Sequence, residues 1–78
     1  NALTDQEIEQ IIENAINNLP EKCRGIFVLN KIEGLTYEQI AQQLDLSPNT
    51  VRNQVAIALK KMKIELKDYV LLLLFLIC

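Results

Sequence analysis

Residues 35–55 read LTYEQIAQQLDLSPNTVRNQV, a stretch that predicts two short helices joined by a tight turn. Thr36 is typical of a helix N-cap, and Gln39 follows at the spacing of a capping box, so the first helix is expected to begin at Tyr37. This helix is expected to end at Asp45, because aspartate is among the few residues besides glycine that tolerate the left-handed backbone of such a turn. Each signal alone would fit an ordinary helical hairpin, but together they favour a helix-turn-helix motif.

The second helix of the pair is expected to begin at Pro48, after Ser47 as its N-cap, because proline suits the first position of a helix. One side of this helix is apolar at helical spacing and carries Val51, Val55, Ala58 and Met62. Its other side is polar and carries Asn49, Thr50, Arg52, Asn53 and Gln54. Asparagine and glutamine pair well with adenine, arginine pairs with guanine, and threonine contacts phosphates or base edges. The polar side is therefore suited to reading the major groove of DNA.

A further block precedes this pair of helices, where residues 19–34 read LPEKCRGIFVLNKIEG. The two blocks are followed by ALKKMK, residues 58–63. In this order and spacing they resemble region 4, the C-terminal promoter-binding domain of bacterial sigma factors of the extracytoplasmic-function group. The resemblance covers residues 6–67, and the two blocks in order are much more specific than a helix-turn-helix alone.

The resemblance implies a role in transcription initiation, in which the domain recognises the −35 element of a promoter as part of an alternative sigma factor acting with RNA polymerase. It also implies an anti-sigma factor as a partner. It further implies that the flap of the polymerase β subunit docks in an apolar groove between the second and third helices, lined by surface residues such as Lys31 and Tyr37. A complete sigma factor also has a promoter-melting domain upstream, so the 78-residue chain is expected to be a fragment.

The predicted DNA-binding residues are Thr36, Ser47, Asn49, Thr50, Arg52, Asn53, Gln54, Lys60 and Lys61. The distribution of charge supports this set, because residues 1–46 carry eight acidic and three basic side chains, whereas residues 47–78 carry five basic and two acidic ones. The basic end favours contacts with DNA phosphates. Lys63 and Lys67 equally suit a solvated helix end, where lysines complement the helix dipole. So few cations predict weak DNA binding by the domain alone.

Two other functions remain open on the sequence. A LuxR-type output domain shares the helix-turn-helix block but lacks the LPEKCR start. A helix-turn-helix-derived protein-interaction module that does not read DNA fits a departure from the family, because Ile57 and Leu59 stand where many relatives have basic residues. We expect Leu59 to join the core. Ile57 instead begins a second apolar line, whose further members are Ile64, Leu71 and Phe75.

The predicted fold is an all-α, four-helix domain with a helix-turn-helix and an apolar C-terminal extension. Residues 4–69 are expected to form the domain. Residues 1–3 are interpreted as a lead-in, in which Asn1 and Ala2 are a remnant of cloning. Residues 70–78 are expected to be an apolar tail that continues the long fourth helix.

The first two helices are predicted from caps and apolar periodicity. Thr4 indicates the N-cap of an amphipathic first helix, and Pro20 is expected to start a second helix that ends at Gly34. Residues 26–29 are apolar on every side, as expected of the helix around which the others pack. Gly25 costs such a helix about 1 kcal/mol relative to alanine, and close packing of a neighbouring backbone is the one explanation that the sequence suggests.

The tail reads VLLLLFLIC, residues 70–78. It is too short to span a membrane, because a spanning helix needs about 20 apolar residues. The remaining choices are burial on the domain itself, contact with another chain, and association with a membrane surface. Self-burial or protein contact is favoured, and for the isolated chain we expect a homodimer formed through the tail, with Leu71 and Phe75 in the second apolar line.

Residues that carry out chemistry are almost absent. The chain has no histidine, and its two cysteines, Cys23 and Cys78, are too few and too far apart in sequence for a zinc site. Cys23 is expected to be a core residue and Cys78 a free thiol. No enzymatic activity, metal or cofactor is predicted. A cytoplasmic location is expected, because reduced cysteines fit that compartment and no signal peptide is visible.

Overall fold

The computed structural model describes residues 4–69, and all of its regular structure is helical. The elements are α1 (Asp5–Asn17), α2 (Glu21–Phe27), the π-helical turn η1 (Val28–Ile32), α3 (Tyr37–Leu44) and α4 (Pro48–Glu65). Because η1 follows α2 without a break, the described chain has four helical segments, and the predicted all-α, four-helix fold is confirmed.

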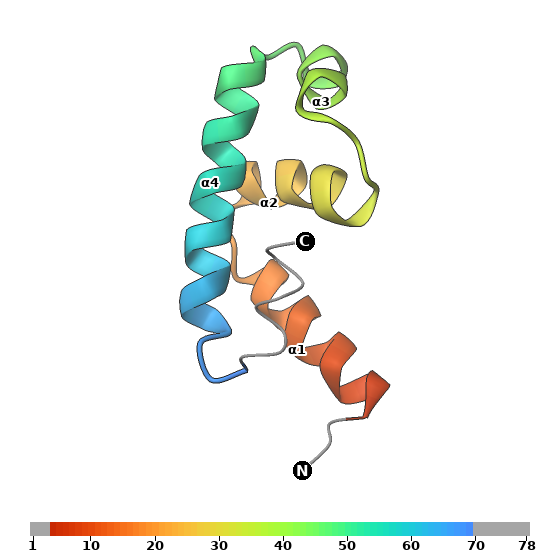
Figure 1. Cartoon of the computed structure of the whole chain (residues 1–78), viewed down its shortest axis with the longest axis vertical. Coiled ribbons are helices and arrows are strands. Elements are labelled where there is room, and N and C mark those ends of the chain that lie inside the picture. The colour runs from red at the N-terminus through yellow and green to blue at the C-terminus, as the bar shows by residue number, and fades with distance from the viewer. Residues whose placement is uncertain (1–3, 70–78) are drawn as a thin grey trace.

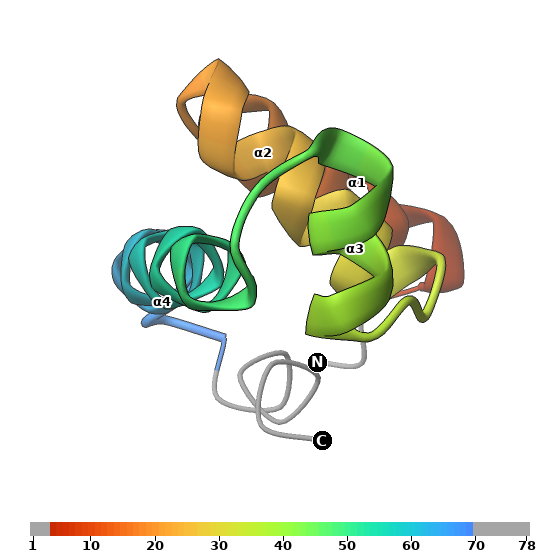
Figure 2. The same cartoon turned by 90° about the horizontal axis from the view of Figure 1, so that it is seen from above.

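Helix α4 is the element against which the others pack (Figure 1). Helix α2 crosses α4 near its middle, α3 lies beside its first turns, and α1 lies beside its last turns. In the view from above, α4 stands on one side and the other three helices on the opposite side (Figure 2). This arrangement leaves the outer face of α4 open to solvent.

The turn between α3 and α4 forms as the sequence predicts. The Thr36 hydroxyl accepts a hydrogen bond from the Gln39 backbone N–H at 3.1 Å, and the Gln39 side chain accepts one from the Thr36 N–H at 2.8 Å. Asp45 has a φ of 56°, in the left-handed region. The Leu46 N–H then bonds back to the Ala41 carbonyl at 2.8 Å, which closes a Schellman motif and ends α3.

The predicted starts of α1 and α4 are also confirmed, whereas Pro20 is the N-cap of α2, which begins at Glu21. The Ser47 hydroxyl accepts a hydrogen bond from the Thr50 N–H at 3.0 Å, and Pro48 is the first residue of α4. Thr4 forms a capping box with Glu7 at the start of α1. Each of these caps satisfies backbone N–H groups that a helix leaves unpaired at its first turn.

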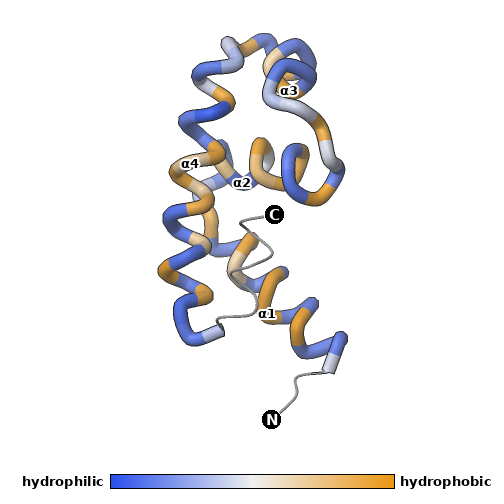
Figure 3. Tube along the Cα trace, in the orientation of Figure 1, coloured by the Kyte–Doolittle hydropathy of each residue, from blue (hydrophilic) through white to orange (hydrophobic). Residues whose placement is uncertain are grey.

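The core consists of two clusters of buried side chains joined along α4. The first, which we call the α1 cluster, contains Ala15, Leu19, Cys23, Phe27, Ala58, Met62 and Leu66. The second, which we call the HTH cluster, contains Ile26, Ile40, Ala41, Val51 and Val55. Apolar and hydrophilic residues alternate along α4 as expected of a helix that is buried on one side (Figure 3).

Several core predictions are confirmed by these clusters. The predicted apolar side of α4, from Val51 to Met62, is buried throughout. Leu59 packs against both clusters, so it belongs to the core as expected. Cys23 is buried as a core residue, with its Sγ 3.6 Å from the Pro20 carbonyl oxygen.

The second helix differs from its prediction at residues 28–32. These residues form a π-helical turn, in which the Glu33 N–H bonds to the Val28 carbonyl at 3.0 Å. The Asn30 side chain donates to the Leu35 carbonyl at 2.9 Å and fixes the connection to α3. Ile26 and Phe27 are buried, but residues 28 and 29 are only half-buried. The prediction that the others pack around this helix is wrong, because α4 is the element that contacts α1, α2 and α3.

The explanation suggested for Gly25 is also wrong. A Cβ atom added at Gly25 would meet no atom within 4 Å, so no neighbouring backbone of the domain packs against it. Gly34, in contrast, has a φ of 78° and ends the second helical segment as predicted.

Helix α4 ends at Glu65 and not in the tail. Leu66 is its C-cap and is buried in the α1 cluster, and a turn follows at residues 66–68. The Asn18 side-chain amide donates to Glu65 Oε1 at 3.3 Å, which joins the ends of α1 and α4. Residues 1–3 and 70–78 lie outside the described residues, and with them the predicted lead-in and the apolar tail.

No helix within residues 4–69 is long and apolar enough to cross a membrane.

Candidate nucleic-acid interface

The polar residues predicted to read DNA lie together on the first turns of α4. Asn49, Arg52 and Asn53 are exposed, whereas Thr50 and Gln54 are half-buried. Residues three and four positions apart share one face of a helix, so the three exposed side chains project from the same face. This face lies at the N-terminal end of α4, on the side away from the buried Val51 and Val55.

Arg52 contacts the neighbouring helix. Its guanidinium carbon lies 5.8 Å from the centre of the Tyr37 ring, which is the geometry of a cation–π interaction. Tyr37 is half-buried and packs against the HTH cluster from the first position of α3. Sequence reasoning assigned Tyr37 to a protein contact and missed its contact with Arg52, because nothing local in the sequence indicates which side chains of two helices meet.

Thr36 and Ser47 lie at the starts of α3 and α4, and both hydroxyls cap their helices. The Ser47 hydroxyl additionally donates to the Thr50 hydroxyl at 2.9 Å. Both residues are exposed, so the positive ends of the two helix dipoles are accessible to a phosphate group.

Lys60 and Lys61 are exposed on α4, about two turns beyond Arg52, roughly 12 Å along the helix axis. They are thus separated from the polar face formed by Asn49, Arg52 and Asn53 by a distance that would suit contacts with a DNA backbone. Ile57 lies between the two sets and is 43% exposed, and Ile64 is 64% exposed. Both isoleucines therefore lie on the surface, as the second apolar line requires, whereas Leu71 and Phe75 lie outside the described residues.

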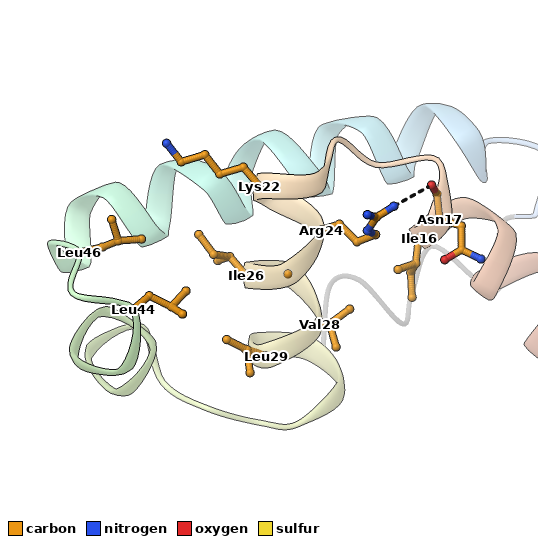
Figure 4. A pocket seen from close by; sticks show the side chains of 10 residues that line it. Ile16, Asn17, Lys22, Arg24, Ile26, Val28, Leu29, Leu44 and Leu46 are labelled. Carbon is orange, nitrogen blue, oxygen red and sulfur yellow. Dashed lines mark hydrogen bonds between the residues drawn. The ribbon is translucent and has the colours of Figure 1, made fainter.

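An open groove of about 520 Å³ lies across the outer face of α2 (Figure 4). Its lining residues are Ile16, Asn17, Lys22, Arg24, Gly25, Ile26, Val28, Leu29, Leu44 and Leu46. Part of it therefore lies between the second helix and α3, where an apolar groove was expected. Lys31 and Tyr37 are not among the lining residues.

Within residues 4–69, no group of three or more histidine, cysteine, aspartate or glutamate side chains is placed to hold a metal ion.

Comparison with known proteins agrees with this geometry. Residues 9–62 match the family described as Sigma-70, region 4. The ECF RNA polymerase sigma-E factor of Haemophilus influenzae is 38% identical over 55 residues, which cover 70% of this chain and 29% of that protein. The sigma-E factors of Salmonella typhimurium and of Escherichia coli K12 are each 36% identical over 55 residues, with the same coverage.

The chain thus spans 29% of the length of these relatives. No solved structure matches it significantly. Because the match to the family covers most of the chain and includes the helix-turn-helix and the helix before it, the protein belongs to the sigma-70 region 4 family.

Proposed function

We propose that this domain recognises the −35 element of promoters as the C-terminal part of an alternative sigma factor that acts with RNA polymerase in transcription initiation. The observation that carries this proposal is the exposed polar face formed by Asn49, Arg52 and Asn53 on the first turns of α4. It belongs to the second helix of a helix-turn-helix, the helix that such motifs insert into the major groove. The named sigma-E relatives support the same role.

The proposed mechanism separates base reading from backbone binding. Arg52 donates two hydrogen bonds to a guanine, and Asn49 and Asn53 pair with adenines. Lys60 and Lys61, with the helix starts at residues 36 and 47, contact phosphates and set the position of the domain without reading sequence. The role is one of binding and not of catalysis.

The test is the binding of Arg52→Ala to a labelled duplex with a −35-like element and to single-base variants of it, with and without core RNA polymerase. The substitution should cost about 1–3 kcal/mol and relax preference at one base pair. Lys63→Ala is the matched control and should retain the preference. Equal weakening on every duplex would show that Arg52 contacts phosphate, and no sequence preference in the parent chain would contradict promoter recognition.

Under this proposal the partners are promoter DNA and core RNA polymerase, and the site of action is the cytoplasm. The β flap of the polymerase would dock in the groove between the second helix and α3, an assignment that the apolar lining of that groove supports. An anti-sigma factor would bind the domain to restrain it. A homodimer of the isolated chain, formed through the tail and the exposed Ile57 and Ile64, is also proposed.

One observation favours a second candidate function. Ile57 is exposed between the base-reading face and the two lysines, so an apolar side chain stands at a surface position where a phosphate contact would suit DNA binding better. A protein-interaction module that does not read DNA would have this feature. The duplex experiment separates the two functions, because only the promoter-reading domain distinguishes single-base variants. A LuxR-type output domain is disfavoured, since the matched region includes the helix before the shared motif.

A further inference from the structure

A second open groove, of about 390 Å³, lies between α1 and η1. We call it the α1 groove, and its lining residues within the described chain are Glu9, Ile12, Glu13, Ile16 and Ile32. Ile12 and Ile16 are half-buried, and Ile32 is 53% exposed. Both glutamates are exposed. The α1 groove therefore combines three incompletely covered isoleucines with two carboxylates that remain in water.

Helix α1 is only partly covered by the described domain. Among its residues, all of which the structure describes, Ala15 alone is buried, whereas Ile8, Ile11, Ile12 and Ile16 are half-buried. Apolar residues recur along the helix (Figure 3). Residues 12 and 16 are four positions apart, so they share one flank of the helix. The α1 cluster covers Ala15 and leaves this flank open to a further segment.

The described chain leaves the domain close to the α1 groove. Leu66 is 1% exposed in the α1 cluster, against which the isoleucines of α1 also pack. The Tyr69 N–H bonds to the Leu66 carbonyl at 2.9 Å, so the last described residue lies within one turn of this cluster. The bond from the Asn18 side chain to Glu65 holds the end of α1 at the same place. Residue 70 therefore begins near the end of α1.

The nine residues beyond Tyr69 have the composition and the length to cover the α1 groove. They read VLLLLFLIC and carry no charged side chain. The rise of α1 from Glu9 to Ile16 is about 10 Å. Nine residues span about 13 Å as a helix and at most about 30 Å when extended, so the tail is long enough in either conformation. Its direct attachment to the domain also gives it a local concentration of roughly millimolar, which favours it over a free partner.

We propose that residues 70–78 bind in the α1 groove of their own chain, running along α1 from Ile16 toward Glu9 and covering the three isoleucines. An uncharged segment would do so without burying the carboxylates at the groove. The opposite side of the tail then remains available to Ile57 and Ile64 of a second copy, so the groove positions the surface used by the proposed homodimer. Because α1 lies beside the last turns of α4, the polar face on the first turns of α4 stays uncovered (Figure 1).

Cys78, at the end of the tail, allows a direct test in the full chain. Glu9→Cys and Glu13→Cys each place a thiol in the α1 groove, and under a mild oxidant at least one of them should form a disulfide with Cys78 within one chain. Glu38→Cys, which replaces an exposed glutamate of α3 outside the groove, is the matched control and should not. Non-reducing gels and peptide mass mapping would separate disulfides within a chain from those between chains, and would detect any that involve the buried Cys23.

A pair of exposed isoleucines tests the apolar contact. Ile32, in the groove, and Ile64, outside it, are 53% and 64% exposed. Ile32→Gln should lower the yield of the disulfide within one chain, whereas Ile64→Gln should not. Ile32→Gln should also lower the Tm of the parent chain by about 4–8 °C. In a full-length chain whose leucines at residues 71–74 are changed to glutamine, the same substitution should have little effect on the Tm, because the groove then has no apolar segment to lose.

The results that would overturn the proposal are distinct. A disulfide of Cys78 formed only between chains would show that the α1 groove holds the tail of a second copy. Absence of any disulfide between Cys78 and the groove thiols would show that the tail lies elsewhere. An equal loss of Tm from Ile32→Gln with either tail would show that Ile32 packs only within the described domain. None of these measurements involves DNA or RNA polymerase, so the proposed function is tested separately.

Discussion

Arg52 and Tyr37 show, at the scale of single residues, how a residue on one helix restricts the side-chain conformation of a residue on another. A free arginine side chain loses much rotamer freedom when it binds a base. The Tyr37 ring, 5.8 Å from the Arg52 guanidinium and half-buried against the HTH cluster, restricts that freedom in the free domain, before the binding of DNA that we propose. Tyr37 would then contribute to base reading without touching a base.

We therefore expect Tyr37→Leu to reduce the preference for the base read by Arg52, by about 0.5–1 kcal/mol, the strength of an exposed cation–π contact. Tyr37→Phe keeps the ring and should keep the preference. The measurement is the ratio of affinities for the −35-like duplex and its single-base variant. A leucine variant with the parent ratio would show that the contact has no role in reading.

At the scale of elements, the turn between α3 and α4 sets the direction of α4, the helix that we propose reads the bases. Helix α3 has eight residues, too few to be stable in isolation, so it depends on its caps and on the HTH cluster. Asp45 holds the turn with its φ of 56°, a conformation that costs most residues other than glycine steric strain.

Asp45→Ala should consequently lower the free energy of unfolding by about 1 kcal/mol, because alanine tolerates the left-handed region less well than aspartate. Asp45→Gly should restore or exceed the parent stability, since glycine adopts this conformation without steric cost. Urea denaturation would measure both, with an unchanged m value expected. An alanine variant as stable as the glycine variant would show that the left-handed conformation is not maintained.

The start of each helix was predictable from sequence, whereas contacts between helices were not. Caps such as Thr36 and Ser47 accept hydrogen bonds from backbone N–H groups three residues later, so the spacing of a cap from its partner can be read from the sequence. The π-helical turn at residues 28–32 was missed because the same side chains fit an α-helix, and only the fit to neighbouring elements selects the wider turn. The groove across α2 was placed only approximately, because three separate elements build its lining.

At the scale of the whole molecule, the described domain leaves apolar surface on α4 unpaired. Ile57 and Ile64 are exposed at 43% and 64%, seven residues apart on the same helix. Burial of such a side chain contributes about 1.5–3 kcal/mol, so another surface that covers them would gain stability. The apolar residues 70–78 are the part of this chain with the composition to provide it.

We expect the intact chain to sediment as a dimer and a chain truncated after Tyr69 as a monomer. Ile64→Gln should shift the intact chain toward monomer, whereas Lys63→Gln, its exposed neighbour, should not. Analytical ultracentrifugation over a range of concentrations would measure each. Two monomeric and equally stable species, intact and truncated, would contradict the proposed role of the tail.

The division of the core into two clusters has a consequence for how the domain opens and refolds. The HTH cluster joins residues that are closer in sequence, from Ile26 to Val55, whereas the α1 cluster extends from Ala15 to Leu66, near the two ends of the domain. Closing the longer loop costs more entropy, so the HTH cluster should form first during refolding. In native-state hydrogen exchange, the amides of α1 should exchange through a partial opening that leaves α3 and the first half of α4 protected. The half of the domain that we propose reads DNA would then stay folded while α1 is unfolded. Uniform protection across all four helices would show instead that the two clusters unfold together.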